Sequence, residues 1–179
     1  MRILGIDPGS RVTGYGIIEK RGRDWCHVDN GIIAPNARLP MAERLHIIYR
    51  SISDLIVLHR PQALALERVF LDANPQTAIK LGQARGMAML ACAEHSLVLG
   101  EYTPLAVKQA VVGYGRASKL QIQDMVKRQL HLPETACEDA SDALAIALTH
   151  ALALVVPESA APLFADRTRT GSWRQWRPA

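Results

Sequence analysis

The sequence predicts an α/β protein with a five-stranded mixed sheet flanked by helices. Three short strand-like segments follow one another at the start of the chain, which is typical of an antiparallel meander. Two further strand-like segments, at 63–67 and 97–102, alternate with segments in which apolar residues recur at helical spacing. Apolar residues make up 49% of the 179 positions, which is enough to cover both faces of such a sheet.

The first strand ends on a carboxylate. Residues 2–7 contain a short apolar run that closes on Asp7, and Pro8-Gly9 then forms a tight turn. Residues 13–19 return as the second strand, and 24–34 form the third. These turn residues are ordinary turn formers, so the turn by itself does not indicate a site. However, ligands of sheets flanked by helices bind at the carboxyl ends of the strands, which is where we expect Asp7.

A second strand repeats this arrangement. Residues 39–58 carry apolar side chains at helical spacing, and Pro61 ends the helix that they predict. The apolar run at 63–66 then closes on Glu67. If this strand pairs in parallel with the first, Asp7 and Glu67 lie at the same edge of the sheet.

The next helix carries a stripe of small residues. Asn74-Pro75 supplies a capping side chain and a proline at the first helical position, so we expect a helix that runs to His95. Ala78, Gly82 and Gly86 recur in it at intervals of four. Each glycine inside a helix costs on the order of 1 kcal/mol relative to alanine. We therefore expect a helix, from this subunit or from a second one, to pack close against the stripe.

Three helices are expected after the last strand, over 103–113, 118–130 and 135–155. The first begins with a Thr-Pro pair that is typical of a helix start. The other two begin with Ser or Thr three residues before Gln or Glu, which is the capping-box pattern. Thr135 is thus predicted to cap the last helix, together with Glu138.

The chain divides into one domain over residues 1–156 and a basic tail over 157–179, which we expect to be disordered because Pro, Ser, Ala, Thr and Arg dominate it. No apolar run reaches the ~20 residues that span a membrane, and the start of the chain lacks a secretory signal pattern. Three widely separated cysteines form neither a zinc motif nor a disulfide framework. We therefore expect a cytoplasmic protein without membrane contact.

Charge is segregated along the chain. The stretch at 80–128 is rich in Lys and Arg, whereas 129–166 contains acidic residues and neither Lys nor Arg. A basic stretch beside an acidic one suits a polyanion that is bound next to a cation site. A solvated surface can also carry such a pattern, so charge alone does not decide between these interpretations.

Two more carboxylates open the last helix. Asp139 and Asp142 are three residues apart and therefore share one face of the helix. Acids are common in the first turn of a helix for structural reasons alone. Here, however, the apolar run at 143–147 predicts a buried helix, which would turn both acids toward the sheet.

Convergence of these four carboxylates would require a cation. Two like charges ~4 Å apart repel by ~4 kcal/mol at an effective dielectric constant of about 20. Oxygen ligands select hard divalent ions such as Mg²⁺ or Mn²⁺, and four carboxylates suffice for two of them. Paired ions suit in-line displacement at a phosphodiester. Asp7, on the central strand, is best placed to bridge the two ions.

Five motifs together resemble the RuvC family of Holliday junction endonucleases over roughly residues 2–150. They are GIDPGSRVTGYG at 5–16, LERVF at 66–70, KLGQARG at 80–86, VKQAVVG at 107–113 and DASDALAIALTH at 139–150. The resemblance implies a ribonuclease H-like fold, a homodimer and a branch-migration motor complex as partner. It also implies Mg²⁺-dependent paired nicks in opposed strands of a four-way DNA junction during recombination and repair, leaving 5′-phosphate and 3′-hydroxyl ends. Asp7, Glu67, Asp139 and Asp142 match the family's catalytic, metal-binding acids.

Further residues are candidates for DNA contacts. Phe70 matches the family's aromatic residue that stacks on a junction base, although a phenylalanine there could also belong to the core. Lys108 and Lys119 match family lysines near the scissile phosphate, although each could be a solvated helix lysine. Arg85 and Arg116 are candidate phosphate contacts from composition alone.

Two other functions compete with a nuclease. An actin-like or sugar-kinase ATPase also has an Asp-x-Gly turn after its first strand, but it needs two domains to clamp a nucleotide. The glycine-containing segment at 113–119 does not have the spacing of a phosphate-binding P-loop. A non-catalytic junction-binding module is the second alternative, and the presence of all four acids argues against it.

Overall fold

The computed structural model describes residues 1–68 and 75–154. Its sheet has five strands in the order β3-β2-β1-β4-β5. Strands β1, β2 and β3 form an antiparallel meander, and β4 and β5 extend it in parallel with β1. The mixed sheet predicted from the sequence is therefore confirmed. The strands are β1 (Arg2–Asp7), β2 (Thr13–Arg21), β3 (Asp24–Ile33), β4 (Ala63–Glu67) and β5 (Val98–Tyr102).

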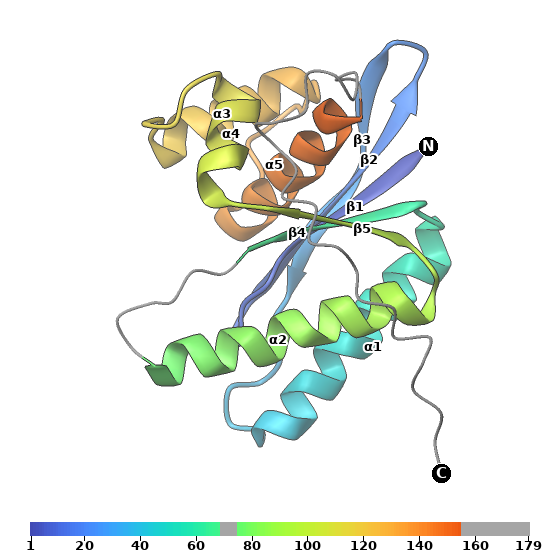
Figure 1. The fold of residues 1–179 in the computed structure, drawn as a ribbon, viewed down its shortest axis with the longest axis vertical. Coiled ribbons are helices and arrows are strands. Elements are labelled where there is room, and N and C mark those ends of the chain that lie inside the picture. Colours follow the sequence, from blue (N-terminus) through green and yellow to red (C-terminus); the bar gives the residue numbers. More distant parts are fainter. Residues whose placement is uncertain (69–74, 155–179) are drawn as a thin grey trace, which may run out of the picture.

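Helices cover both faces of the sheet. Helices α1 and α2 lie on one face, and α3, α4 and α5 lie on the other (Figure 1). A separate apolar cluster fills the space between the sheet and each helical layer. The helices are α1 (Met41–His59), α2 (Pro75–Glu94), α3 (Pro104–Val112), α4 (Lys119–Gln129) and α5 (Glu138–Ala153).

Strand alternation decides which face each acid reaches. In β1, Leu4 and Ile6 belong to the cluster beneath α1 and α2, so Asp7 points to the opposite face, toward α5. In β4, Leu66 belongs to the same cluster, so Glu67 also points toward α5. The parallel register pairs Ile6 with Leu66, and it therefore places the two acids side by side at the carboxyl ends of their strands.

Glycines let α5 lie directly on the sheet. A Cβ atom at Gly5 of β1 would stand 2.1 Å from the backbone oxygen of Ala143, and one at Gly14 of β2 would stand 2.0 Å from that of Asp139. No side chain larger than hydrogen fits at either position. The helix is buried along most of its length, from Ala143 to Ala151. This close contact brings the start of α5 to the end of β1.

The start of α5 differs from the prediction. The helix begins at Glu138 with Cys137 as its N-cap, and Cys137 makes no side-chain capping hydrogen bond. The predicted capping box of Thr135 and Glu138 is therefore wrong. Ala136 packs against the core before the helix starts, and the Glu138 carboxylate pairs with Lys119 instead of folding back. The capping box predicted at Ser118 is confirmed in α4.

The small-residue stripe of α2 has no neighbour in the described part of this chain. A Cβ atom at Gly82 or Gly86 would meet nothing within 4 Å among the residues that the structure describes. Helix α2 instead contacts the core through Ala84 and Ala88. Two neighbours were expected for the stripe: a helix of this subunit or a helix of a second one. No helix within residues 1–68 and 75–154 packs against Gly82 or Gly86. Packing against a second subunit stays a prediction.

In the same two ranges, none of the helices is long and apolar enough to cross a membrane. The expected cap at Asn74 and the expected disordered tail at 157–179 lie outside the described residues. The boundary of the domain at residue 156 also lies outside them, and it therefore stays a prediction.

Candidate active site

Four carboxylates from three elements gather at one end of the sheet. Asp7 ends β1 and Glu67 ends β4, while Asp139 and Asp142 lie in the first two turns of α5. The charges of the other three acids all act on Asp7 and raise its pKa. Asp7 therefore lies at the centre of the group.

The environment of three of these acids, Asp7, Glu67 and Asp142, opposes their ionisation. Burial, followed by the charges of Glu67, Asp142 and Asp139, raises the pKa of Asp7 to about 7. Burial and then the charge of Asp142 raise the pKa of Glu67. Burial also raises the pKa of Asp142, although Lys119 acts in the opposite direction. A cation would stabilise the ionised form of carboxyls whose pKa is raised in this way.

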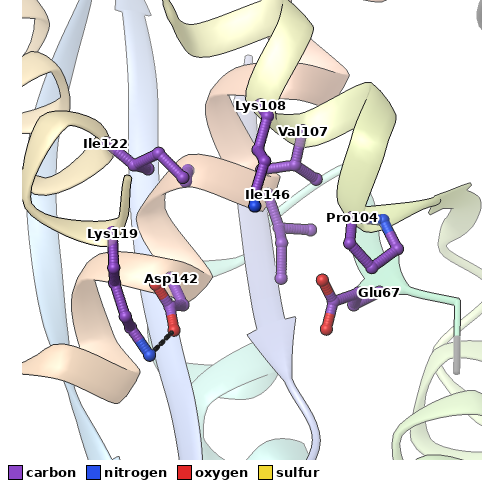
Figure 2. A pocket seen from close by; sticks show the side chains of 9 residues that line it. Glu67, Pro104, Val107, Lys108, Lys119, Ile122, Asp142 and Ile146 are labelled. Carbon is purple, nitrogen blue, oxygen red and sulfur yellow. Dashed lines mark ion pairs between the residues drawn. The ribbon is translucent and has the colours of Figure 1, made fainter. Parts of the chain in front are cut away.

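One cation is already present within the chain. The Nζ atom of Lys119, on α4, lies 2.8 Å from Oδ2 of Asp142 (Figure 2). It also lies 2.5 Å from Oε1 of Glu138. Burial by itself lowers the pKa of Lys119, but the hydrogen bonds to these two carboxylates outweigh burial and raise it above the ordinary value. The carboxylates of Asp142 and Glu138 thus stabilise a positive charge at this position.

Two of the four acids, Glu67 and Asp142, line a pocket of about 200 Å³. Figure 2 shows Glu67 and Asp142 on its walls, with Lys108 of α3 and Lys119 of α4 reaching toward the same space. The remaining lining is apolar, from Pro104, Val107, Ile122, Ala145 and Ile146. Two carboxylates and two ammonium groups on an apolar wall suit a ligand that combines phosphate with a cation.

The donor set fits a hard divalent cation. Within the described ranges, no three His, Cys, Asp or Glu side chains stand in an arrangement that would hold a metal ion as they are. The ammonium group of Lys119 pairs with one carboxylate oxygen of Asp142. Four carboxylates that destabilise one another, with an ammonium group beside them, match the oxygen ligands that Mg²⁺ and Mn²⁺ prefer.

The turn after Asp7 is held by contacts that the sequence did not indicate. Thr13 donates its hydroxyl hydrogen to the Gly9 carbonyl oxygen over 2.8 Å and accepts the Gly9 N–H over 3.3 Å. Arg44, from α1, donates to the Ser10 carbonyl oxygen. The only signal in the sequence was a threonine at the start of a strand, directly after a glycine turn. These contacts fix the segment that follows Asp7.

The comparison with protein families identifies the family of this chain. The model of the family described as crossover junction endodeoxyribonuclease RuvC matches residues 3–150, which contain all four acids. The chain belongs to the RuvC family. Among curated proteins, RuvC of Geobacter sulfurreducens is 57% identical over 156 residues, covering 87% of this chain and 95% of that one. RuvC of Neisseria meningitidis is 52% identical over 152 residues, covering 85% of each chain.

Solved RuvC structures have the same fold. Thermus thermophilus RuvC, in complex with a Holliday junction substrate, is 33% identical and has a TM-score of 0.81, with 85% of this chain and 93% of that chain covered. This match confirms the ribonuclease H-like fold that the resemblance implied. The yeast mitochondrial Holliday junction resolvase Ydc2 is 11% identical with a TM-score of 0.59, and this likeness shows the fold alone.

The candidate DNA contacts of this RuvC-family chain lie in different surroundings. Lys108 and Lys119 line the pocket, and Arg116 is exposed in the connection between α3 and α4. Arg85 lies on α2, where it pairs with Glu101. Phe70 lies outside the described residues, so its expected stacking on a junction base stays a prediction.

Proposed function

We propose that this chain resolves Holliday junctions by paired, metal-dependent nicks in opposed DNA strands. The observation that carries the proposal is the convergence of four carboxylates, from β1, β4 and α5, beside a pocket that two lysines also line. Membership of the RuvC family supports the same conclusion. The substrate class follows from the relatives, one of which is titled as a complex with a Holliday junction substrate.

In the proposed site, Asp7, Glu67, Asp139 and Asp142 hold two Mg²⁺ ions, for which Mn²⁺ can substitute. When bound, such ions lower the pKa of an attacking water and stabilise the leaving 3′-oxygen, so that cleavage leaves a 5′-phosphate and a 3′-hydroxyl. Asp7, on which the charges of the other three acids act, would be a ligand common to both ions. The apolar wall of the pocket limits access of bulk water and so strengthens the electrostatic interactions within it.

The basic residues act on the DNA backbone. Lys108 and Lys119 contact the phosphates next to the cut, and Arg116 contacts a more distant phosphate. Lys119 faces two carboxylates when no ion is bound. With a cation held by Asp142, the ammonium group of Lys119 would be available to the scissile phosphate. Phe70 stacks on an unpaired junction base.

The protein acts as a homodimer, because two cuts related by the two-fold symmetry of the junction need two identical sites. The open space over Gly82 and Gly86 of α2 supports a second copy on this face. We further propose that the dimer works in the cytoplasm with a branch-migration motor complex. Residues 1–156 form the nuclease domain, and 157–179 form a tail that cleavage does not need.

Cleavage of defined DNA substrates tests this proposal. Four-way, forked and linear DNA of the same sequence are incubated with the full chain, with and without Mg²⁺, and a solution mass is measured in parallel. We expect symmetric nicks in the four-way DNA only when Mg²⁺ is present, and the mass of a dimer. Tight junction binding without nicking would indicate a binding module, and ATP turnover without nicking would indicate an ATPase.

A further inference from the structure

Arg85 reaches the end of β4 from the face opposite to the acids. Strand alternation turns Glu67 toward α5, whereas Glu101 of β5 is paired with Leu66 and points with it toward α2. Arg85 of α2 forms an ion pair with Glu101 there. Its Nε–H also donates to the backbone carbonyl oxygen of Glu67 over 3.3 Å.

The peptide that follows Glu67 is therefore held on both sides. Its carbonyl oxygen accepts from Arg85, and its N–H, which belongs to Arg68, donates to the carbonyl oxygen of Tyr102 over 2.7 Å. This is the last peptide before β4 leaves the sheet. Because both of its polar groups are bonded, its plane is fixed, and so is the direction in which the Glu67 side chain leaves the backbone.

The partners of Arg85 occupy two of the five N–H donors of its guanidinium group, on Nε and Nη2. The side chains of Arg85 and Glu101 are 22% and 25% exposed, so neither is a freely solvated surface group. One side of the guanidinium group is bonded to a carboxylate and the Nε–H to a carbonyl oxygen. Both partners belong to strand ends that lie next to each other in the sheet.

We propose that Arg85 is a positioning residue that orients Glu67 toward the divalent ions, and that Glu101 is the counter-charge that keeps it in place. This inference rests on the proposed function of the site. It replaces the expectation, drawn from composition alone, that Arg85 contacts DNA phosphate. Residues behind a metal ligand typically change metal affinity 10–100-fold when they are removed.

Two substitutions separate positioning from phosphate contact. Arg85→Ala removes both interactions, and Arg85→Lys keeps the charge but loses the planar group that bonds two partners at once. We expect both variants to need about 10-fold more Mg²⁺ for half-maximal junction cleavage. Arg50→Ala, which removes an exposed arginine of α1, is the matched control and should behave as the unchanged protein does.

Two measurements without cleavage complete the test. Mn²⁺ binding to the DNA-free full chain, followed by calorimetry, should weaken about 10-fold in both Arg85 variants. Junction binding in EDTA should keep the salt dependence of the unchanged protein, because no phosphate contact is lost. Thermal melting shows whether each variant is folded. If Arg85→Ala does not fold, the same measurements on Arg85→Lys decide the test.

The results that overturn the inference are distinct. Unchanged Mg²⁺ and Mn²⁺ dependence in Arg85→Ala refutes the positioning role. If Arg85→Ala also lowers the salt slope by about one charge while Arg85→Lys restores it, Arg85 contacts phosphate. If the unchanged protein does not nick junctions at all, the proposed function fails, whereas weaker Mn²⁺ binding in the variants would still support positioning.

Discussion

Replacing Asp7 with asparagine should stabilise the ion-free protein while it abolishes cleavage. The pKa of Asp7 is raised to about 7 in the folded protein from an ordinary value of 3.8, because of burial and three neighbouring carboxylates. A raised carboxyl pKa means that the folded state holds a proton that the unfolded chain has already lost. The stability of the unchanged protein therefore falls as the pH rises from about 4 to about 7.

The magnitude follows from this shift. A difference of about 3 pKa units at 1.36 kcal/mol per unit corresponds to about 4 kcal/mol of lost folding stability. This loss is fully present above pH 7 and absent below pH 4. Asparagine has the same shape and does not titrate, so Asp7→Asn should avoid this cost. For a protein of this size, the gain raises the melting temperature by about 8–16 °C at pH 8.

The assay is thermal unfolding in EDTA at several pH values between 5 and 8. The difference between Asp7→Asn and the unchanged protein should grow with pH, and saturating Mg²⁺ should stabilise the unchanged protein more than the variant. Asp54→Asn, which changes an exposed carboxylate of α1, is the control and should shift stability by no more than about 0.5 kcal/mol. A difference that does not vary with pH, or an Asp7→Asn variant that is less stable at pH 8, would refute the reasoning.

The other predictions concern DNA contacts, packing and the tail. Phe70→Ala should slow single-turnover cleavage more than it weakens junction binding in a gel-shift assay. An unchanged rate would indicate that Phe70 is a core residue and does not contact DNA. Alanine at Lys108 or at Lys119 should reduce the salt slope of junction binding, measured by fluorescence anisotropy, by about one charge each, and an unaltered slope would exclude the contact. Gly14→Ala should lower the free energy of unfolding in urea by about 1–3 kcal/mol, because its Cβ would stand 2.0 Å from a backbone oxygen of α5; equal stability would contradict the packing. Deletion of 157–179 should leave junction cleavage intact, and an inactive product would show that the nuclease needs the tail.

Local patterns in the sequence predicted most of the fold. Short apolar runs and turn residues located β1 and β4, and helical spacing of apolar residues located α1. These elements depend on neighbours in the sequence, which is why they could be predicted from it. Parallel pairing of β1 with β4 was the condition under which Asp7 and Glu67 would lie at the same edge, and the structure has this pairing.

Features that depend on contact between distant elements could not be predicted. The pair of Lys119 and Glu138 joins α4 to α5, and it removes Glu138 from the capping box that the local pattern predicted. Arg85 is one of many basic residues in the sequence, and only the meeting of α2 with the ends of β4 and β5 distinguishes it. The sequence also did not indicate the role of the strand glycines. At Gly5, the absence of a Cβ atom allows the backbone of α5 to lie directly on the sheet.

The central claim is that the four carboxylates hold divalent ions together. Anomalous diffraction from crystals soaked in Mn²⁺ tests it most directly, because it locates the ion without reference to activity. We expect Mn²⁺ peaks bounded by Asp7, Glu67, Asp139 and Asp142, with Lys119 displaced from Asp142. An absence of Mn²⁺ from these acids, at a concentration that supports junction cleavage in solution, would contradict it.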